Sequence, residues 1–420
     1  MSNEKYTAVR GMLLTILATA LIGSSAWGQT FKVLHAFGEE AYSQYGLIFD
    51  GQGNLYGVTP YGGDGYGTAY QLKPNSDGTW TETVIHAFSD SGGTYPSSSL
   101  LLDSQGNLYG SASGQARYPD VVYQLTPGSN GTWTESVLYQ FPPGGGNGDN
   151  PGELTFDAAG NIFGTTRFGG VNREGTVFSL NRLSGWQESL VLTFDGNNGL
   201  GPYGAITFDA NGNLYGTTLG GGAHDSGLVY KLTRSGNTWQ QTVLYNFAGG
   251  PDGNAPWGVT FGPDGSLYGI TQVGGFYGTE FCSLGCGTVF QLTPNSNGTW
   301  TKTTLYAFRG GRYDGAIPTT HVTFDQAGNL YGTTAGGGDS GNGSSTTSCA
   351  PYSRYGCGTV FKLTPSGGGR WTESILHFFA GSLDGFNPDS PLVIDGAGNL
   401  YGTVGNGGLY GGGVAYEIVP

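Results

Sequence analysis

Short apolar runs recur along the chain and are separated by glycine, asparagine, aspartate and proline. The runs are rich in Val, Thr, Tyr, Phe and Trp, a composition typical of β-strands. One run in each of seven units carries the pentapeptide Gly-Asn-Leu-Tyr-Gly or a near variant. Its copies begin at residues 53, 106, 160, 212, 265, 328 and 398. A repeat period near 50 residues indicates a propeller or another repeat array.

Each unit holds four runs in a fixed order. Examples of the first to the fourth run are Leu154–Asp157, Asn213–Thr218, Gly287–Leu292 and Trp239–Phe247. The runs do not alternate between apolar and polar residues, which fits sheets that pack against a neighbour on both faces. Four strands in each of seven units predict an all-β fold, a seven-bladed β-propeller with four antiparallel strands per blade.

The two ends of the chain predict how this ring closes. After the last second-strand run the chain supplies a third strand, residues 413–419, and no fourth run with tryptophan follows. Residues 29–37 match the missing run over their whole length, with Gln29 at the tryptophan position. We therefore expect residues 29–37 to complete the last blade by pairing with the C-terminal strands. The alternative is an open stack of sheets, or a strand register without closure by the N-terminal strand.

The composite repeat unit resembles a known family. Its elements are Asp-Gly-x-x-Pro, Leu-x-Phe-Asp-x-x-Gly-Asn-Leu-Tyr-Gly-Thr-Thr, Gly-Thr-Val-Phe-x-Leu and Val-Leu-Tyr-x-Phe. This unit resembles the GloVer (Gloeo/Verruco) tandem repeat of exported bacterial proteins, and the resemblance covers residues 29–420. The resemblance implies export, and it does not imply any particular biochemical activity. The strand order is also similar to that of NHL-type β-propellers, which implies that Leu-x-Phe-Asp is innermost and the tryptophan strand outermost.

The amino-acid composition argues against a helical fold and against a nucleic-acid-binding function. Glycine contributes 81 of 420 residues, which disfavours helices, and we expect these glycines mainly in the turns between strands. Asp and Glu number 30 against 16 Lys and Arg, for a net charge of −14. Because phosphate binding needs basic clusters, we expect no nucleic-acid partner.

The start of the chain predicts export. Residues 1–28 have a basic beginning, an apolar stretch over 12–22 and a small-x-small site that ends at Gly28, as a secretory signal peptide does. The apolar stretch is too short to cross ~30 Å of hydrocarbon, and we expect no membrane span. Cleavage near Gly28 would leave residues 29–420 as a single propeller domain, secreted or periplasmic, and we expect a monomer.

The four cysteines fit such an oxidising compartment. Cys282 and Cys286 lie in one long insertion, and Cys349 and Cys357 lie in another. The simplest expectation is a disulfide within each insertion, and pairing between the two insertions is the alternative. Neither spacing is that of a CxxC zinc motif and no histidine lies close in sequence, so we expect no metal site and no other cofactor.

Loops on one face of the predicted ring vary in length and sequence, and such loops often carry function. Their aromatic rings, beside Asp and Asn, suit a carbohydrate, because rings stack on sugar C–H groups and carboxylates accept hydroxyl hydrogens. The alternative is that these rings only pack between blades. The residues expected at this ligand-binding face are Tyr42, Tyr45, Tyr66, Tyr203, Trp257, Tyr313 and Phe386.

An enzyme would need acid and base groups that converge near the starts of the innermost strands. The candidates are Glu153, His321 and Asp389, which belong to three different units. The aspartates of the Asp-x-x-Gly turns are instead expected to accept backbone N–H groups. Motifs of serine hydrolases, zinc proteases and P-loop proteins are absent from the sequence.

These observations favour an exported, non-enzymatic propeller that binds a glycan or a protein through its variable loops. One alternative is a propeller enzyme of the lyase, lactonase or glycosidase type at the channel mouth. The other is a structural protein of the envelope or matrix.

Overall fold

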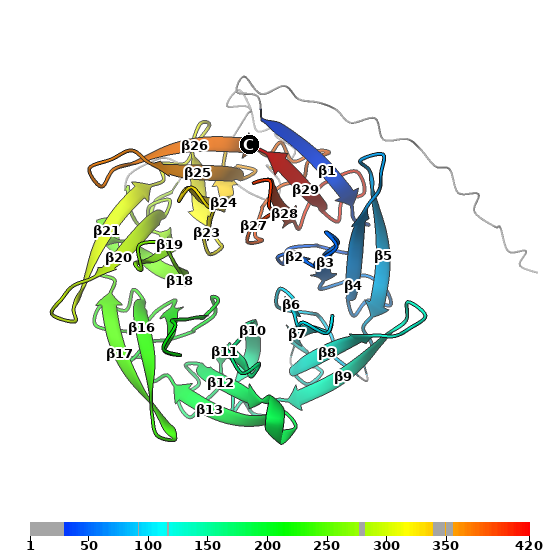
Figure 1. The fold of residues 1–420 in the computed structure, drawn as a ribbon. Coiled ribbons are helices and arrows are strands. Elements are labelled where there is room, and N and C mark those ends of the chain that lie inside the picture. Colours follow the sequence, from blue (N-terminus) through cyan, green and yellow to red (C-terminus); the bar gives the residue numbers. More distant parts are fainter. Residues whose placement is uncertain (1–28, 91, 116, 277–281, 339–348, 350–355) are drawn as a thin grey trace, which may run out of the picture.

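A computed structural model describes residues 29–90, 92–115, 117–276, 282–338, 349 and 356–420, which form a ring of sheets around a central axis (Figure 1). The predicted signal peptide, residues 1–28, lies outside the described residues. Regular helix within this part of the chain is confined to two short 3₁₀ turns, Arg182–Ser184 and Gly250–Asp252.

Seven antiparallel sheets form the blades, each built from the innermost strand outwards. Blade 1 holds β2 (Ile48–Phe49), β3 (Leu55–Thr59), β4 (Thr68–Pro74) and β5 (Trp80–Ala87), and blade 2 holds β6 (Leu101–Leu102), β7 (Leu108–Ala112), β8 (Val121–Pro127) and β9 (Trp133–Gln140). Blade 3 holds β10 (Asp149–Phe156), β11 (Ile162–Phe168), β12 (Thr176–Asn181) and β13 (Gln187–Thr193), and blade 4 holds β14 (Thr207–Phe208), β15 (Leu214–Thr218), β16 (Leu228–Ser235) and β17 (Thr238–Asn246).

Blade 5 holds β18 (Asn254–Phe261), β19 (Leu267–Val273), β20 (Thr288–Pro294) and β21 (Trp300–Ala307). Blade 6 holds β22 (Gly315–Pro318), β23 (Thr323–Phe324), β24 (Leu330–Gly337), β25 (Thr359–Pro365) and β26 (Trp371–Phe378). Blade 7 holds β27 (Val393–Ile394), β28 (Leu400–Val404), β29 (Val414–Val419) and β1 (Thr30–Ala36). In blade 6 both β22 and β23 pair with β24, so the innermost strand is interrupted between Pro318 and Thr323.

The N-terminal strand closes the ring, as the sequence predicts. β1 pairs antiparallel with β29, from Thr30 opposite Val419 to Ala36 opposite Val414. The blue and red ends of the chain accordingly lie side by side in blade 7 (Figure 1). The predicted seven-bladed fold, with Leu-x-Phe-Asp innermost and the tryptophan strand outermost, is confirmed.

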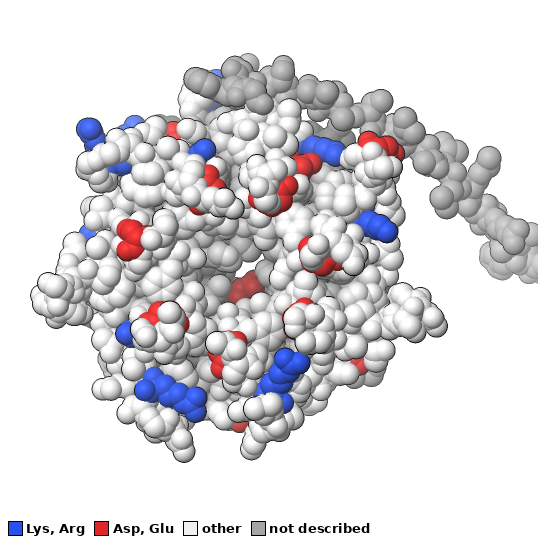
Figure 2. All heavy atoms as spheres, in the orientation of Figure 1, with Lys and Arg blue, Asp and Glu red and all other residues white. Residues whose placement is uncertain are grey.

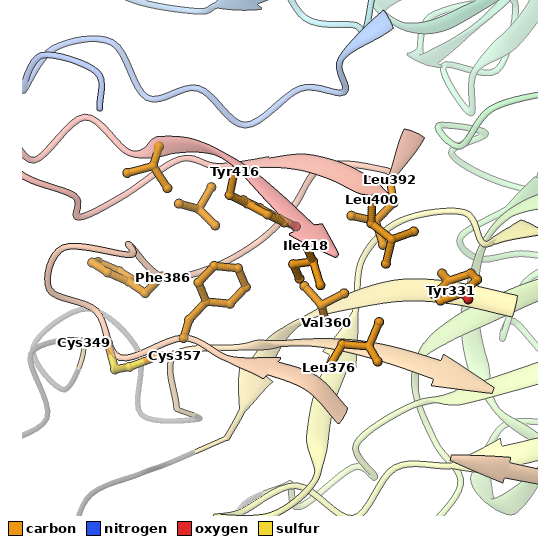
Figure 3. Close-up of a cluster of buried hydrophobic side chains, with 13 residues drawn as sticks. Tyr331, Cys349, Cys357, Val360, Leu376, Phe386, Leu392, Leu400, Tyr416 and Ile418 are labelled. Carbon is orange, nitrogen blue, oxygen red and sulfur yellow. A yellow bond between two sulfur atoms is a disulfide. The ribbon is translucent and has the colours of Figure 1, made fainter. Parts of the chain in front are cut away.

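The hydrophobic core is divided among the contacts between neighbouring blades. Buried side chains of the described residues form seven clusters, and each cluster joins two adjacent blades. Figure 3 shows the cluster between blades 6 and 7, where Val360 and Leu376 of blade 6 face Ile418 and Tyr416 of blade 7. Both faces of a blade are therefore buried, which explains why odd and even positions of a run are both apolar.

Some glycines serve this packing rather than the turns. Gly57 lies inside β3, opposite Tyr70 of β4, and a Cβ there would lie 2.4 Å from the Tyr70 Oη. Each second strand repeats this pairing of a glycine with an aromatic ring of the third strand. The expectation that glycine mainly marks turns is therefore incomplete, because this glycine makes room for a buried ring.

The Asp-x-x-Gly turns have the predicted role. Asp50 Oδ1 accepts the backbone N–H groups of Gln52 and Asn54 at 2.8 and 2.9 Å, and its Oδ2 accepts the Asn54 side-chain amide at 2.7 Å. Equivalent bonds recur at Asp103, Asp157, Asp209, Asp325 and Asp395. These carboxylates thus stabilise the turns between first and second strands.

The closure generates a stability prediction. Phe31 of β1 stacks on His377 of blade 6 at a centroid distance of 3.8 Å and packs against Phe379 and Tyr416. Phe31→Ala should lower the free energy of unfolding by roughly 2–3 kcal/mol, a little less than a fully buried phenylalanine would. Urea unfolding of the protein without residues 1–28 measures this effect. Val84→Ala, at a 49 % exposed position of β5, is the control and should cost under about 0.5 kcal/mol. Equal small effects would contradict closure by β1.

Candidate functional site

A cavity of ≈ 260 Å³ lies at the centre of the ring and takes lining residues from all seven blades or the loops before them. Figure 2 shows the molecule hollowed at its centre, with acidic atoms deep in the hollow. The lining comprises the ionisable residues Glu153, His321 and Asp389, the aromatic residues Tyr45, Tyr203 and Trp257, the neutral polar residues Gln44, Ser97, Gln272, Thr319 and Thr320, and Ala205 and Pro391. The three acid–base candidates of the sequence, 236 residues apart at their extremes, thus meet in one cavity.

A single repeat position supplies most of this lining. In five blades a proline occupies one repeat position, in the loop before the innermost strand or within β18 or β22, and the residue directly after it faces the cavity. These residues are Ser97, Tyr203, Trp257, Thr319 and Asp389. Blade 1 has Ser43 in place of the proline and contributes Gln44, and blade 3 has Gly152 after its proline and contributes the next residue, Glu153. The backbone therefore repeats while the side chain at the cavity changes.

The residue before each of these prolines holds the loop in place. It has a left-handed backbone in every blade, with φ of 57°, 56° and 62° for Tyr95, Ile317 and Asn387, for example. In five blades its N–H donates to a carbonyl in the preceding blade, as from Ile317 to Cys286 O and from Asn387 to Cys357 O, both at 2.8 Å, and in blade 3 the N–H of Asn150 donates to the Asp120 carboxylate at 2.6 Å. The loop is thus anchored two residues before its cavity-facing side chain.

A glycine of the preceding blade fits against each of these prolines. At Gly287, which precedes β20, an added Cβ would lie 2.5 Å from Cδ of Pro318. The same approach, at 2.4 to 2.6 Å, occurs for Gly67, Gly175, Gly227 and Gly358. The Gly of the Gly-Thr-Val-Phe motif therefore sets the distance between neighbouring blades at the rim of the cavity.

Glu153 is held by the neighbouring blade. Its carboxylate accepts the backbone N–H of Ser99 at 3.1 and 3.2 Å and the Ser99 hydroxyl at 2.9 Å, and that hydroxyl accepts the N–H of Gly46 at 2.9 Å. Burial raises the pKa of Glu153, while the bonds from Ser99 act in the opposite direction. The three residues occupy equivalent positions in blades 1, 2 and 3, so one hydrogen-bonded chain links these blades around the cavity.

Asp389 has a different environment in the cavity. It accepts the Thr319 hydroxyl at 3.1 Å and the side-chain amide of Asn387. Burial raises the pKa of Asp389 to about 6, against the effect of these two bonds. Its carboxylate is therefore ionised at neutral pH and takes up a proton in mildly acidic solution.

His321 lies in the interruption between β22 and β23. Burial lowers the pKa of His321 to about 4, so its imidazole is neutral above that pH. Its ring has no hydrogen-bond partner among the described residues and remains available to a ligand in the cavity.

Aromatic rings form another part of the lining. Tyr203 and Trp257 meet edge to face, with centroids 5.0 Å apart and planes at 71°. Burial and the nearby Tyr203 raise the pKa of Tyr45, and burial with the charge of Glu153 raises the pKa of Tyr203. Both hydroxyls are therefore neutral hydrogen-bonding groups beside a carboxylate.

The other residues expected at the ligand-binding face lie outside the cavity. Tyr42, 41 % exposed, and Tyr66 belong to a row of tyrosine rings with centroids 5.5 to 6.2 Å apart over blades 1 and 2. Tyr313 is 77 % exposed, and the Arg312 guanidinium lies 5.9 Å from the centroid of its ring. Phe386 is only 6 % exposed and packs in the cluster between blades 6 and 7 (Figure 3), so it serves the core.

The disulfides pair within each insertion, Cys282 with Cys286 and Cys349 with Cys357. Local pairing is confirmed, and the alternative of pairing between the insertions is wrong. Two disulfides fit an extracellular or periplasmic protein. Within the described ranges no three His, Cys, Asp or Glu side chains lie together as a metal site would need. The helices of those ranges are also too short and too polar to cross a membrane.

Five polar residues of the lining are not predicted from the sequence: Gln44, Ser97, Gln272, Thr319 and Thr320. For three of them a signal existed. Gln44, Ser97 and Thr319 occupy the repeat position after the proline, or after Ser43, where the residue type differs between units although the flanking pattern repeats. A position that varies inside a strict repeat is free of the packing constraint that fixes its neighbours.

The contact between glycine and proline yields a matched pair of variants in blade 5. Gly287→Ala combines a left-handed backbone, φ 97°, with a collision against Pro318, whereas Gly298, φ 84°, has nothing within 4 Å of an added Cβ. Gly298→Ala should cost about 1 kcal/mol of unfolding free energy from backbone strain alone. Gly287→Ala should cost roughly 1–3 kcal/mol more, because the rim is overpacked. Urea unfolding compares the two, and equal costs would contradict a structural role for the contact.

Solved structures resemble this fold at low sequence identity. The extracellular domain of a proposed one-component system from Bacteroides thetaiotaomicron has a TM-score of 0.54 and 10 % identity, over 92 % of this chain and 39 % of that chain. The chain thus spans well under half the length of that protein. A proposed 6-phosphogluconolactonase from Bacteroides uniformis has a TM-score of 0.51 and 14 % identity, over 90 % of this chain and 100 % of that chain. At such identities the likeness shows the fold alone.

No curated protein sequence matches the chain. The model of the Gloeobacter/Verrucomicrobia repeat matches it twice, over residues 22–204 and 150–347. These two overlapping ranges cover most of the chain and agree with the repeat unit that builds the blades. The chain therefore belongs to the Gloeobacter/Verrucomicrobia repeat family.

Proposed function

We propose that this protein is an exported, non-enzymatic carbohydrate-binding propeller whose central cavity receives one sugar residue. The observation that carries the proposal is the cavity lining, where Tyr45, Tyr203 and Trp257 lie beside Glu153 and Asp389. Aromatic rings offer flat apolar surfaces for sugar C–H groups, and the carboxylates and amides offer partners for hydroxyls.

The size of the cavity supports a small ligand. A volume of ≈ 260 Å³ lies just below the range of ~300–1,000 Å³ that is usual for small-molecule sites. This volume suits one sugar ring better than an extended segment of a protein. The residue of a longer glycan that enters the cavity would be a chain end or a protruding branch.

Export belongs to the same proposal. The predicted signal peptide would be cleaved near Gly28, and the mature chain from residue 29 would begin just before β1, which starts at Thr30. Cleavage at this point leaves the ring-closing strand intact. The two disulfides support a secreted or periplasmic location.

A second candidate, hydrolysis of a glycoside or lactone, is favoured by the raised pKa of Asp389. The pKa of about 6 would let this carboxyl group donate a proton in mildly acidic solution. We favour binding because Glu153 and Asp389 accept hydrogen bonds from fixed neighbours, Ser99 and Thr319. Release of a reducing sugar from a glycoside, or of an acid from a lactone, by the wild type and its loss in Asp389→Asn would overturn this preference.

The binding function predicts a specific effect of one aromatic ring. A glycan array with the mature protein identifies a ligand, and isothermal titration calorimetry then compares variants. Trp257→Ala should weaken binding at least tenfold, about 1.4 kcal/mol, because stacking on the sugar is lost. Tyr313→Ala, at a 77 % exposed position outside the cavity, is the control and should bind like the wild type. Absence of any glycan ligand would favour the alternative of a structural protein.

A further inference from the structure

The cavity carries negative charge that no cation of the protein balances. Its lining contains Glu153 and Asp389 and, among the described residues, neither lysine nor arginine. Four ion pairs occur in the described part of the chain, and neither of these carboxylates takes part in one. Arg167 contacts the Tyr203 ring at 5.6 Å and is not part of the lining.

Neutral groups alone stabilise the two carboxylates. Glu153 accepts from Ser99, and Asp389 accepts from Thr319 and Asn387. A partly buried carboxylate without a counter-charge is costly, and a cation that enters the cavity would offset this cost. Unbalanced charge in a cavity therefore favours a cationic ligand over a neutral one.

The positions of the two acids indicate the size of that cation. Glu153 belongs to blade 3 and Asp389 to the loop before the innermost strand of blade 7, three blades apart in a ring of seven. They consequently lie on different walls of the cavity, and no metal-binding group is formed by the described residues. A bare metal ion needs several such ligands together, whereas an ammonium group needs only one carboxylate and the rest of an organic cation can fill the cavity.

The aromatic rings point to the same class of ligand. Trp257, Tyr203 and Tyr45 line the cavity together with the carboxylates. Rings of this kind attract ammonium groups through their negative faces, by ~0.5–2 kcal/mol according to exposure. They also stack on sugar rings, so a sugar that carries an ammonium group would use both parts of the lining.

We infer that the ligand of the central cavity is an amino sugar with a free ammonium group, which the negative charge of Glu153 and Asp389 attracts while the aromatic rings pack against the sugar. The inference rests on the proposed carbohydrate-binding function and narrows its ligand class. An acetylated amino group has no positive charge and would leave the carboxylates unbalanced. Neutral and acidic sugars should therefore bind less well than the free amine.

This ligand class gives a pH dependence with a defined sign. Asp389, with a pKa of about 6, gains its negative charge between pH 5 and 7, while the ligand amine, with a pKa near ~8, stays protonated. His321 is already neutral over this range, and the tyrosine hydroxyls stay neutral. Affinity for the amino sugar should consequently rise from pH 5 to 7 and fall again above ~8. Affinity for a neutral sugar should change little.

The experiment is calorimetric titration of the mature protein with glucosamine, glucose and N-acetylglucosamine at pH 5, 6, 7 and 9. We expect glucosamine to bind at least tenfold more tightly than glucose at pH 7, with N-acetylglucosamine no tighter than glucose. Asp389→Asn and Glu153→Gln keep the shape of the cavity and should each reduce this preference severalfold. Glu40→Gln removes one charge from an exposed position outside the lining and should leave the preference unchanged.

The outcomes separate the inference from the proposed function. Equal binding of glucosamine and glucose, or tighter binding of glucosamine at pH 5 than at pH 7, would overturn the ammonium inference and leave carbohydrate binding standing. Failure of all three sugars and of a glycan array would overturn both. Because the comparison of sugars uses the wild type, it decides the question even where a variant does not fold.

Discussion

The structure depends on the close approach of a glycine in one blade to a proline in the next. The backbone of Gly287 and its equivalents lies so near the proline ring that a side chain has no room. The adjacent carbonyl, such as Cys286 O beside Gly287, accepts the N–H of the residue before that proline. One contact therefore fixes both the spacing of two blades and the path of the loop that reaches the channel. The contact recurs at five of the seven junctions between blades, which distributes the same geometry over most of the ring.

This contact constrains the residues that pack the blades together and leaves the cavity-facing residue after the proline free to vary. The glycine and the proline are constrained by their close contact, so their types recur in five blades, and the residue before the proline keeps its left-handed backbone although its type varies. The residue after the proline faces the cavity and makes none of these contacts, and it is serine, tyrosine, tryptophan, threonine or aspartate in different blades. A repeat protein can thus change the chemistry of its centre one blade at a time without disturbing the packing. The cavity combines acids and rings because each comes from a separate copy of one unit.

The features of the fold that can be predicted from the sequence are those that recur in every repeat. Seven blades and closure by residues 29–37 follow from the spacing and from one missing run, because every copy obeys the same packing, whereas the order of strands from the centre outwards is what the resemblance to NHL-type propellers implies. The meeting of Glu153, His321 and Asp389 follows only from the radius of the closed ring, which no local pattern encodes. Phe386 was expected at the ligand-binding face and is buried, because a glycine-rich loop does not reveal whether its ring points outward or into the blade contact. Tyr45, Tyr203 and Trp257, expected at the same face, do line the cavity.

The disulfides follow from the same constraint. Blades 5 and 6 carry the long insertions between their second and third strands, and each insertion ends at the carbonyl that must hold the next loop. A long loop would leave that carbonyl poorly fixed, since the conformations open to a loop increase with its length. Cys286 and Cys357 carry these carbonyls and are themselves cross-linked to Cys282 and Cys349. These carbonyls accept the N–H groups of Ile317 and Asn387, which lie two residues before the cavity residues Thr319 and Asp389. The disulfides therefore stabilise the loops that place these two side chains at the cavity.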